Sequence, residues 1–135
     1  MVNTLQVILF ASSTALTTGL TAELTPHTAQ ISMQTNGSQL PIQGLAPYFT
    51  GPVRVEPLFQ AHGDARAAGA TVTFEPSSRT HWHTHPLGQT LVVTYGKGWV
   101  QQWQGQRLVI EPGDVIHIPA NVKHWHGATD KTAMT

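Results

Sequence analysis

The sequence predicts an all-β fold with a single domain, either an antiparallel sandwich or a small barrel. From residue 53 onwards, short runs rich in β-branched and aromatic residues alternate with turns rich in Gly and Pro, and no segment shows a helical period of useful length. The composition agrees, because 135 residues of which 40% are hydrophobic suit one soluble domain.

The strands expected after Pro52 are short, because a turn sequence ends each run. Typical separators are Glu75-Pro76-Ser77-Ser78 and Glu111-Pro112-Gly113-Asp114, which combine residues that favour tight turns. The expected strands cover residues 53–60, 68–75, 80–85, 90–95, 99–103, 107–110, 115–118 and 123–128.

The segment before these strands has two parts. Residues 1–22 are predicted to be a secretory signal peptide, because an apolar run is followed by small residues and no charge occurs before Glu23. Since residues 1–4 contain no Lys or Arg, an unstructured extension or a start codon placed too far upstream is the alternative. Residues 23–52 are a lead-in rich in Pro and Gly, with at most one short strand over 29–33. The mature protein is expected in the periplasm or secreted, away from the membrane, and in the cytoplasm if the signal is not functional.

Composition also excludes several kinds of function. Seven basic and seven acidic residues leave no net charge, so the basic surface on which nucleic-acid binding depends is not expected. The absence of cysteine excludes disulfides, thiolate metal sites and thiol nucleophiles. Histidine is the outlier with eight residues, six of them between positions 81 and 126, so the chemistry is expected there.

The first histidine cluster occupies one expected strand. Alternate side chains of a strand share a face, so His81, His83 and His85 would project together if this segment is extended. After the turn at 86–88, Gln89 begins the next strand and can bring its amide oxygen to the same face. Without further support, these residues could equally be polar side chains on exposed strands, and Gln89 could bond a water instead of a metal.

His124 and His126 form a second cluster, and two motifs in the sequence resemble those of the cupin family. The first motif is His83-Thr84-His85 followed by Gln89 and Gly96, where cupins usually carry Glu at the position of Gln89. The second is Gly113, Pro119 and then His124, with His126 two residues later. The nearest resemblance is to the small bacterial manganese cupins that include cupin-type hydroxynitrile lyases, and it rests on the runs 48–51, 53–59, 83–90 and 123–128.

This resemblance implies a cupin β-barrel, a jelly-roll-like double-stranded β-helix, over residues 53–135. It also implies metal ligands at His83, His85, Gln89 and His124, with His126 as a catalytic group beside the metal. The expected ion is Mn²⁺, although Fe, Ni and Zn also accept such N and O ligands. A small-molecule substrate and a homo-oligomer are the expected partners.

Three kinds of function stay open at this point. They are a lyase that cleaves α-hydroxynitriles, a metal-dependent oxidoreductase such as a dioxygenase, and a non-catalytic protein that binds metal or a small molecule. Related cupins continue past the segment matching 132–135 with a histidine and a further strand, so the sequence is either a fragment or lacks these parts. The second case would favour the binding role.

Other histidines and the tryptophans are expected to have structural roles. His81 is read as a structural or rim residue, and His27, His62 and His117 as surface or core residues. Trp82 and Trp125 alternate with the ligand histidines, so they should face away from the metal and pack between sheets or at a dimer contact.

Overall fold

The computed structural model describes residues 30–135. The expected signal peptide, His27 and the first residue of the expected strand over 29–33 lie outside the described residues. The described part forms ten strands and no helix, which confirms the all-β prediction, and so it holds no helical segment able to cross a bilayer. The strands are β1 (Ile42–Gln43), β2 (Phe49–Thr50), β3 (Val53–Phe59), β4 (Gly69–Phe74), β5 (Arg79–Thr80), β6 (Gln89–Val92), β7 (Gly98–Gln102), β8 (Arg107–Ile110), β9 (Val115–Ile118) and β10 (His124–Ala128).

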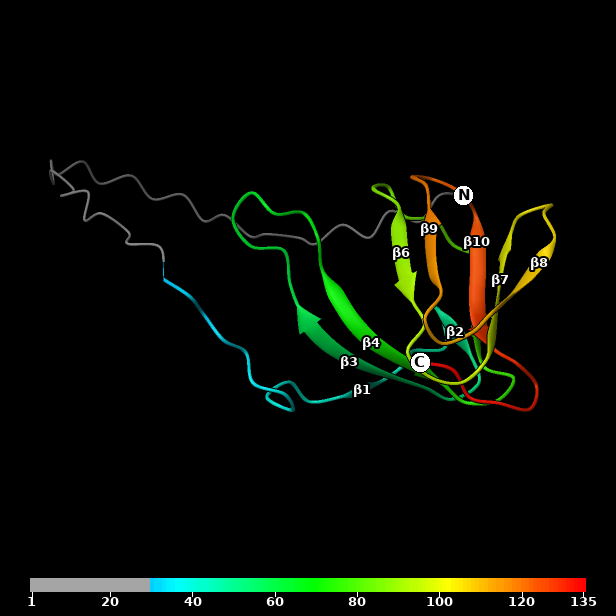
Figure 1. The fold of residues 1–135 in the computed structure, drawn as a ribbon, viewed down its shortest axis with the longest axis horizontal. Helices are drawn as coiled ribbons and strands as arrows, with labels where there is room; N and C mark the ends of the chain where they lie inside the picture. The colour runs from blue at the N-terminus through cyan, green and yellow to red at the C-terminus, as the bar shows by residue number, and fades with distance from the viewer. Residues whose placement is uncertain (1–29) are drawn as a thin grey trace, which may run out of the picture. The chain divides into compact units, whose positions relative to one another are not determined.

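The strands form three antiparallel sheets. One has the order β1-β3-β4, the largest has the order β2-β5-β10-β7-β8, and the third pairs β6 with β9. Figure 1 shows β6 and β9 standing beside β10 and β7, while the β3–β4 hairpin extends away from them. Strands far apart in sequence are therefore neighbours, and β10 lies between β5 and β7 at the centre of the largest sheet.

Two sequence expectations about strands are wrong. The strand expected over 80–85 ends at Thr80, because a turn over 46–48 precedes its partner β2. The N–H of His81 still donates to the carbonyl of Tyr48 in the register of β2 and β5, and its ring bonds the carbonyl of Ala46. Only His83 returns to pair, as an isolated bridge with His124. Residues 30–33 form no strand either, and the lead-in instead contributes β1 and β2.

Alternation along the strands separates an inner from an outer face. The buried core is Val53, Phe74, Val93, Val100, Ile110, Ile118, Ala128 and Met134. Gly127 lets β10 approach β5 closely, because a Cβ there would collide with Arg79 and with the carbonyl of Ser78. This close approach holds β10, and with it the two histidines of the second cluster, in the middle of the sheet.

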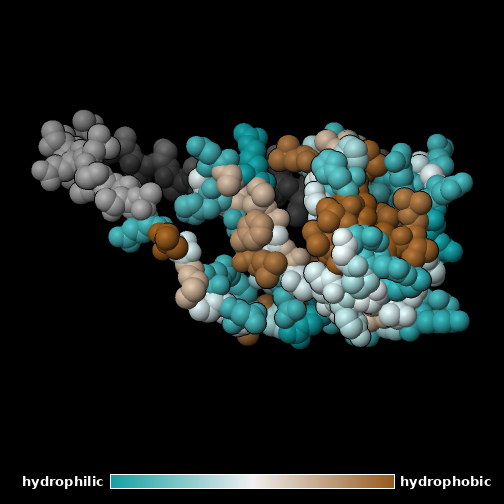
Figure 2. All heavy atoms as spheres, in the orientation of Figure 1, coloured by the Kyte–Doolittle hydropathy of each residue, from teal (hydrophilic) through white to brown (hydrophobic). Residues whose placement is uncertain are grey.

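The outer surface is less uniform. Figure 2 shows hydrophobic residues gathered over the barrel, with mixed and hydrophilic surface elsewhere on the same side. Exposed apolar side chains on the strands of this region are Val92, Leu108, Val109 and Val115.

Candidate metal centre

Three segments bring the four candidate ligands together. His83 and His124 face each other across the isolated bridge, in which the N–H of each donates to the carbonyl of the other at 3.0 Å. His85 lies two residues further along the first segment, and Gln89 is the first residue of β6. The backbone therefore brings residues 41 positions apart in the sequence into direct register.

The side chains converge on a small volume. Ring nitrogens of His83, His85 and His124 all lie within 4.8 Å of one another. The ring centroids of His83 and His124 are 4.3 Å apart, and those of His83 and His85 are 4.9 Å apart. Gln89 joins them, since its Oε1 lies 2.9 Å from Nε2 of His124. These are the four residues that the cupin resemblance implies as ligands.

Backbone carbonyls set the tautomers of two of these rings. Nδ1 of His83 lies 2.8 Å from the carbonyl oxygen of His81, and Nδ1 of His124 lies 2.9 Å from that of Val122. A carbonyl oxygen can only accept, so each Nδ1 carries the proton and donates it. Each neutral ring then keeps its lone pair on Nε2, the orientation in which protein imidazoles bind metals.

This arrangement fits a cation. With the proton on Nδ1, the Nε2 lone pair of His124 and the amide oxygen of Gln89 are two electron-pair donors 2.9 Å apart, so one cation can lie beside both. Adjacent ligands of a six-coordinate ion are about 3.0 Å apart when each bond is about 2.1 Å. In the part of the chain that the structure describes, Nε2 of His85 is buried with no hydrogen-bond partner, so it too can act as a ligand.

The electrostatics favour neutral rings. Burial lowers the pKa of His83 to about 4, with a smaller contribution from the charge that His124 would carry. Burial also lowers the pKa of His85, again with a smaller effect of His124. Neutral imidazole is the form that binds metals, so at neutral pH no proton has to be displaced from either ring.

His126 lies beside this cluster on the inner face of β10. Its ring centroid is 5.7 Å from that of His83 and 5.9 Å from that of His124, with which it is nearly parallel at 13°. Its backbone N–H donates to Oγ1 of Thr80, while its Nε2 is buried and has no partner among the described residues. Burial, followed by the nearby imidazoles, lowers the pKa of His126 to about 3, so the ring is neutral at pH 7.

The three other histidines of residues 30–135 do not join the cluster. His81 points elsewhere, with its ring on the carbonyl of Ala46, and its own carbonyl orients His83. His117 is exposed on β9 and lies 3.3 Å from the hydroxyl of Thr90, and His62 is exposed in the loop after β3.

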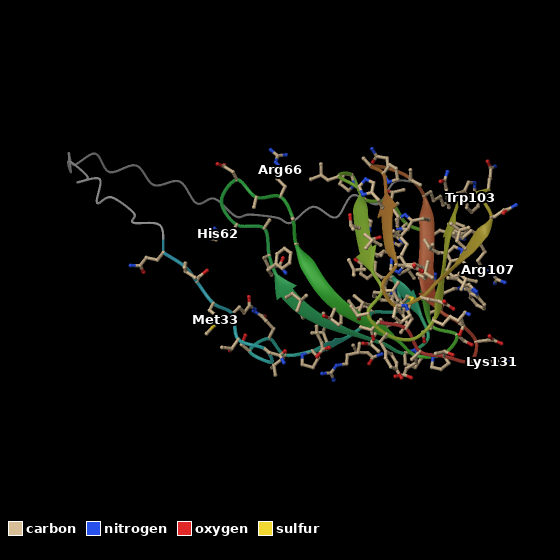
Figure 3. All side chains as sticks on the ribbon, in the orientation of Figure 1. Met33, His62, Arg66, Trp103, Arg107 and Lys131 are labelled. Carbon is tan, nitrogen blue, oxygen red and sulfur yellow. The ribbon has the colours of Figure 1, made fainter. Side chains whose placement is uncertain are left out.

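The tryptophans lie on the opposite face from the candidate metal ligands. Trp82 packs against Trp103 and Trp125 with ring centroids 4.9 Å and 6.4 Å apart. Trp125 donates from Nε1 to Oε1 of Gln101, and Lys123 lies over Trp103. Figure 3 labels Trp103 near the end of the β7–β8 hairpin.

Sequence reasoning missed the supports of the site. The carbonyls of His81 and Val122 each lie two residues before the histidine that they orient, a pattern that strand alternation does not reveal. Phe74 comes from the β1-β3-β4 sheet, and its ring meets that of His126 at 5.6 Å and 82°. The sequence placed Phe74 in the expected strand over 68–75, but nothing in it paired this residue with one 52 positions away.

Comparisons with known proteins agree with this geometry. Residues 70–135 match the family model of the cupin domain. The chain is 59% identical over 99 residues to an (R)-mandelonitrile lyase of Granulicella tundricola, and this match covers 73% of this chain and 76% of the relative. It is also similar to the crystal structure of a cupin-like protein from Thermotoga maritima, with 38% identity, a TM-score of 0.62, and coverage of 77% of this chain and 76% of that one. The chain belongs to the cupin family.

Proposed function

We propose that this protein is a metal-dependent lyase that cleaves α-hydroxynitriles into a carbonyl compound and cyanide. The observation that carries the proposal is the pair of facing acceptors, Nε2 of His124 and Oε1 of Gln89, with the unpartnered Nε2 of His126 buried nearby. The similarity to a protein named (R)-mandelonitrile lyase supports the choice of substrate class.

The residues that would hold the metal are His83, His85, Gln89 and His124. Mn²⁺ is the proposed ion, and Fe, Ni and Zn accept the same donor types. A divalent cation bound there would supply Lewis acidity to the hydroxyl group of a substrate. Because all four donors are neutral, they leave the full double charge of the ion in place, whereas Glu at position 89 would offset part of it.

His126 would handle the proton of the reaction. In an α-hydroxynitrile, the O–H proton passes to Nε2 of His126 while the oxygen electrons form the carbonyl double bond. The bond between carbon and the nitrile breaks, and its electron pair leaves on cyanide. The proton on His126 then passes to cyanide, which leaves as hydrogen cyanide and restores the neutral ring. Burial keeps this ring neutral at pH 7, so one ring nitrogen carries no proton before the reaction begins, and the same burial makes the ring a weaker base.

The direct test combines metal analysis with two assays on the purified protein. We expect close to one divalent ion per chain, release of cyanide from mandelonitrile, and loss of that activity with a chelator that is restored by Mn²⁺. Metal-dependent oxygen consumption without cyanide release would instead support the oxidoreductase function. Bound metal with neither activity would support the binding role and overturn the lyase proposal.

Gln89→Glu tests the charge argument. The added carboxylate should strengthen metal retention and lower the Lewis acidity of the ion, so metal affinity should rise while the rate of cyanide release falls. Titration with Mn²⁺ and initial rates at saturating metal measure the two quantities separately. A rate that rises together with the affinity would contradict the argument.

We also propose that the mature chain is exported and forms a homo-oligomer. Support for self-association comes from the outer face of the largest sheet, where Trp82 and Trp103 keep 38% and 47% of their surface exposed. Light scattering on the purified protein and N-terminal sequencing of protein from the native cell envelope test these proposals. A monomer at micromolar concentration, or an intact Met1 in the envelope fraction, would overturn the respective proposal.

A further inference from the structure

Phe74 is the residue of the opposite wall that meets the ring of His126. Its side chain is 2% exposed, and its ring lies nearly perpendicular to the imidazole, with centroids 5.6 Å apart. The ring of His124 is nearly parallel to the same imidazole at 5.9 Å, and the ring of His83 meets it at 5.7 Å and 65°. Phe74 is therefore the ring from β4 that neighbours the imidazole beside two rings of the candidate metal centre.

The position of Phe74 is itself fixed from several directions. Its N–H donates to the carbonyl of Met134 and its carbonyl accepts from the N–H of Met134, at 2.8 Å and 3.0 Å. Val53 is its partner across β3 and β4, and the ring of Phe49 meets it edge-on at 6.0 Å. Because its backbone and its ring are both held in place, Phe74 can restrict the orientation of a neighbouring side chain.

The imidazole of His126 needs such a neighbour, because its Nε2 makes no hydrogen bond that would fix the orientation of the ring. The backbone N–H of His126 is tied to Thr80, but Nε2 has no hydrogen-bond partner in the described part of the chain. The χ2 torsion of histidine is broad and roughly two-fold, so packing has to select one ring orientation. Perpendicular aromatic pairs contribute about 0.5 to 1.5 kcal/mol beyond their buried area, enough to select one.

We propose that Phe74 is a positioning residue, which holds the imidazole of His126 in the orientation that presents its free nitrogen to the substrate. The expected effect on kcat rests on the proposed lyase function, whereas the expected effect on the ring orientation of His126 does not. Phe74 acts through His126 and contacts no proposed metal ligand in the aromatic pairs that the structure shows.

Kinetics provide the first test, with Phe74→Leu as the variant and Val53→Ala as the matched control. Val53 is 1% exposed and pairs with Phe74, so its truncation disturbs the same core without removing the ring. We expect Phe74→Leu to retain metal and KM while kcat falls roughly 3- to 10-fold, the equivalent of one aromatic pair. An equal fall of kcat in Val53→Ala would overturn the inference, because general loosening of the core would then explain it.

A double-mutant cycle separates action through His126 from any other route. In the His126→Ala background, Phe74→Leu should cause no further loss of kcat, because the group that it positions is absent. A loss of the same factor in both backgrounds would overturn the inference.

A second measurement needs no activity. Nuclear magnetic resonance of the histidine rings in the metal-free protein should show one orientation of His126 in the parent chain and in Val53→Ala. In Phe74→Leu, we expect the ring signal of His126 to shift and broaden as both orientations are populated. An unchanged signal would overturn the inference. If the parent chain releases no cyanide, the lyase proposal fails, and this measurement alone then decides the role of Phe74.

Discussion

His124 and His126 on the inner face of β10 differ sharply in their surroundings from Trp125, which lies between them on the outer face. All three are at most 7% exposed. The polar atom of Trp125 is satisfied, because Nε1 donates to Gln101, and Arg79 lies over its ring. On the inner face, Nε2 of His124 faces another acceptor and Nε2 of His126 has no partner among the described residues.

The five residues of β10 therefore present one face that packs and a second face that carries the candidate metal centre. Buried polar atoms are normally paired, because an unpaired one costs about 1 to 3 kcal/mol. Three buried side-chain polar atoms of the described residues have no partner: two are Nε2 of His85 and Nε2 of His126 at the candidate metal centre, and the third is Oγ of Ser78. A ligand can supply such a missing interaction, and under the proposed function a cation and the proton of the substrate would do so here.

The largest expected effect is that of His124→Ala. Loss of this ligand should lower metal affinity by more than the roughly 10- to 100-fold that a partner outside the ligand set costs, and should abolish cyanide release. Metal content after gel filtration and the cyanide assay measure both. Retention of stoichiometric metal would show that the inner face of β10 is not the metal site.

His126→Ala should separate catalysis from binding. Because His126 is not one of the four proposed ligands, we expect the variant to keep its metal but to lose about 10²-fold or more in kcat, the usual scale for a lost general base. The same two measurements apply. Metal loss equal to that of His124→Ala would make His126 a ligand, and unchanged turnover would make it only a part of the pocket wall.

Acid should lower the stability of the metal-free protein, because the inner face of β10 buries neutral imidazoles. In the folded protein, the pKa of His83 is lowered from 6.5 to about 4 and that of His126 to about 3. Between these values and pH 6.5, the folded state therefore binds fewer protons than the unfolded state. The stability that neutral rings contribute is therefore present above pH 6.5 and is lost as the pH falls from 6.5 toward 3. Urea midpoints between pH 7.5 and pH 4 should decrease accordingly.

The control for this pH effect is His117→Asn. His117 is exposed on β9 and outside the cluster, so its replacement should leave the change of the midpoint with pH as it is in the parent chain. A midpoint that stays constant from pH 7.5 to pH 4 in the parent would contradict the burial of neutral imidazoles.

The smallest effect is expected on the outer face. In Lys123→Ala, the ammonium that lies 3.9 Å from the centre of the Trp103 ring is lost. We expect the free energy of unfolding to fall by about 0.5 to 1 kcal/mol, with metal content and turnover unchanged. Loss of metal in this variant would show that the two faces are coupled, and Arg107→Ala, which removes a similar contact to Trp99 at 4.0 Å, checks the size of the effect.

Strand alternation accounts for most of what was predictable. It placed His124 and His126 on one face and Trp125 on the other, and the Gly and Pro turns located the strands from residue 53 onwards. The prediction failed over 81–85, because the turn over residues 46–48 leaves no partner strand beyond His81. The end of a partner strand so far away in sequence leaves no local signal.

The sequence by itself determined the all-β class, the residue types of the site and the spacing that puts two imidazoles on the same side of a strand. These depend on local geometry, the two-residue period of a strand and the preferences of turn residues. The tertiary structure alone decided which histidine side chains meet Gln89 and that Phe74 lies against His126. These features depend on contacts between segments 35 to 52 residues apart, whose register is set only when the sheets pack.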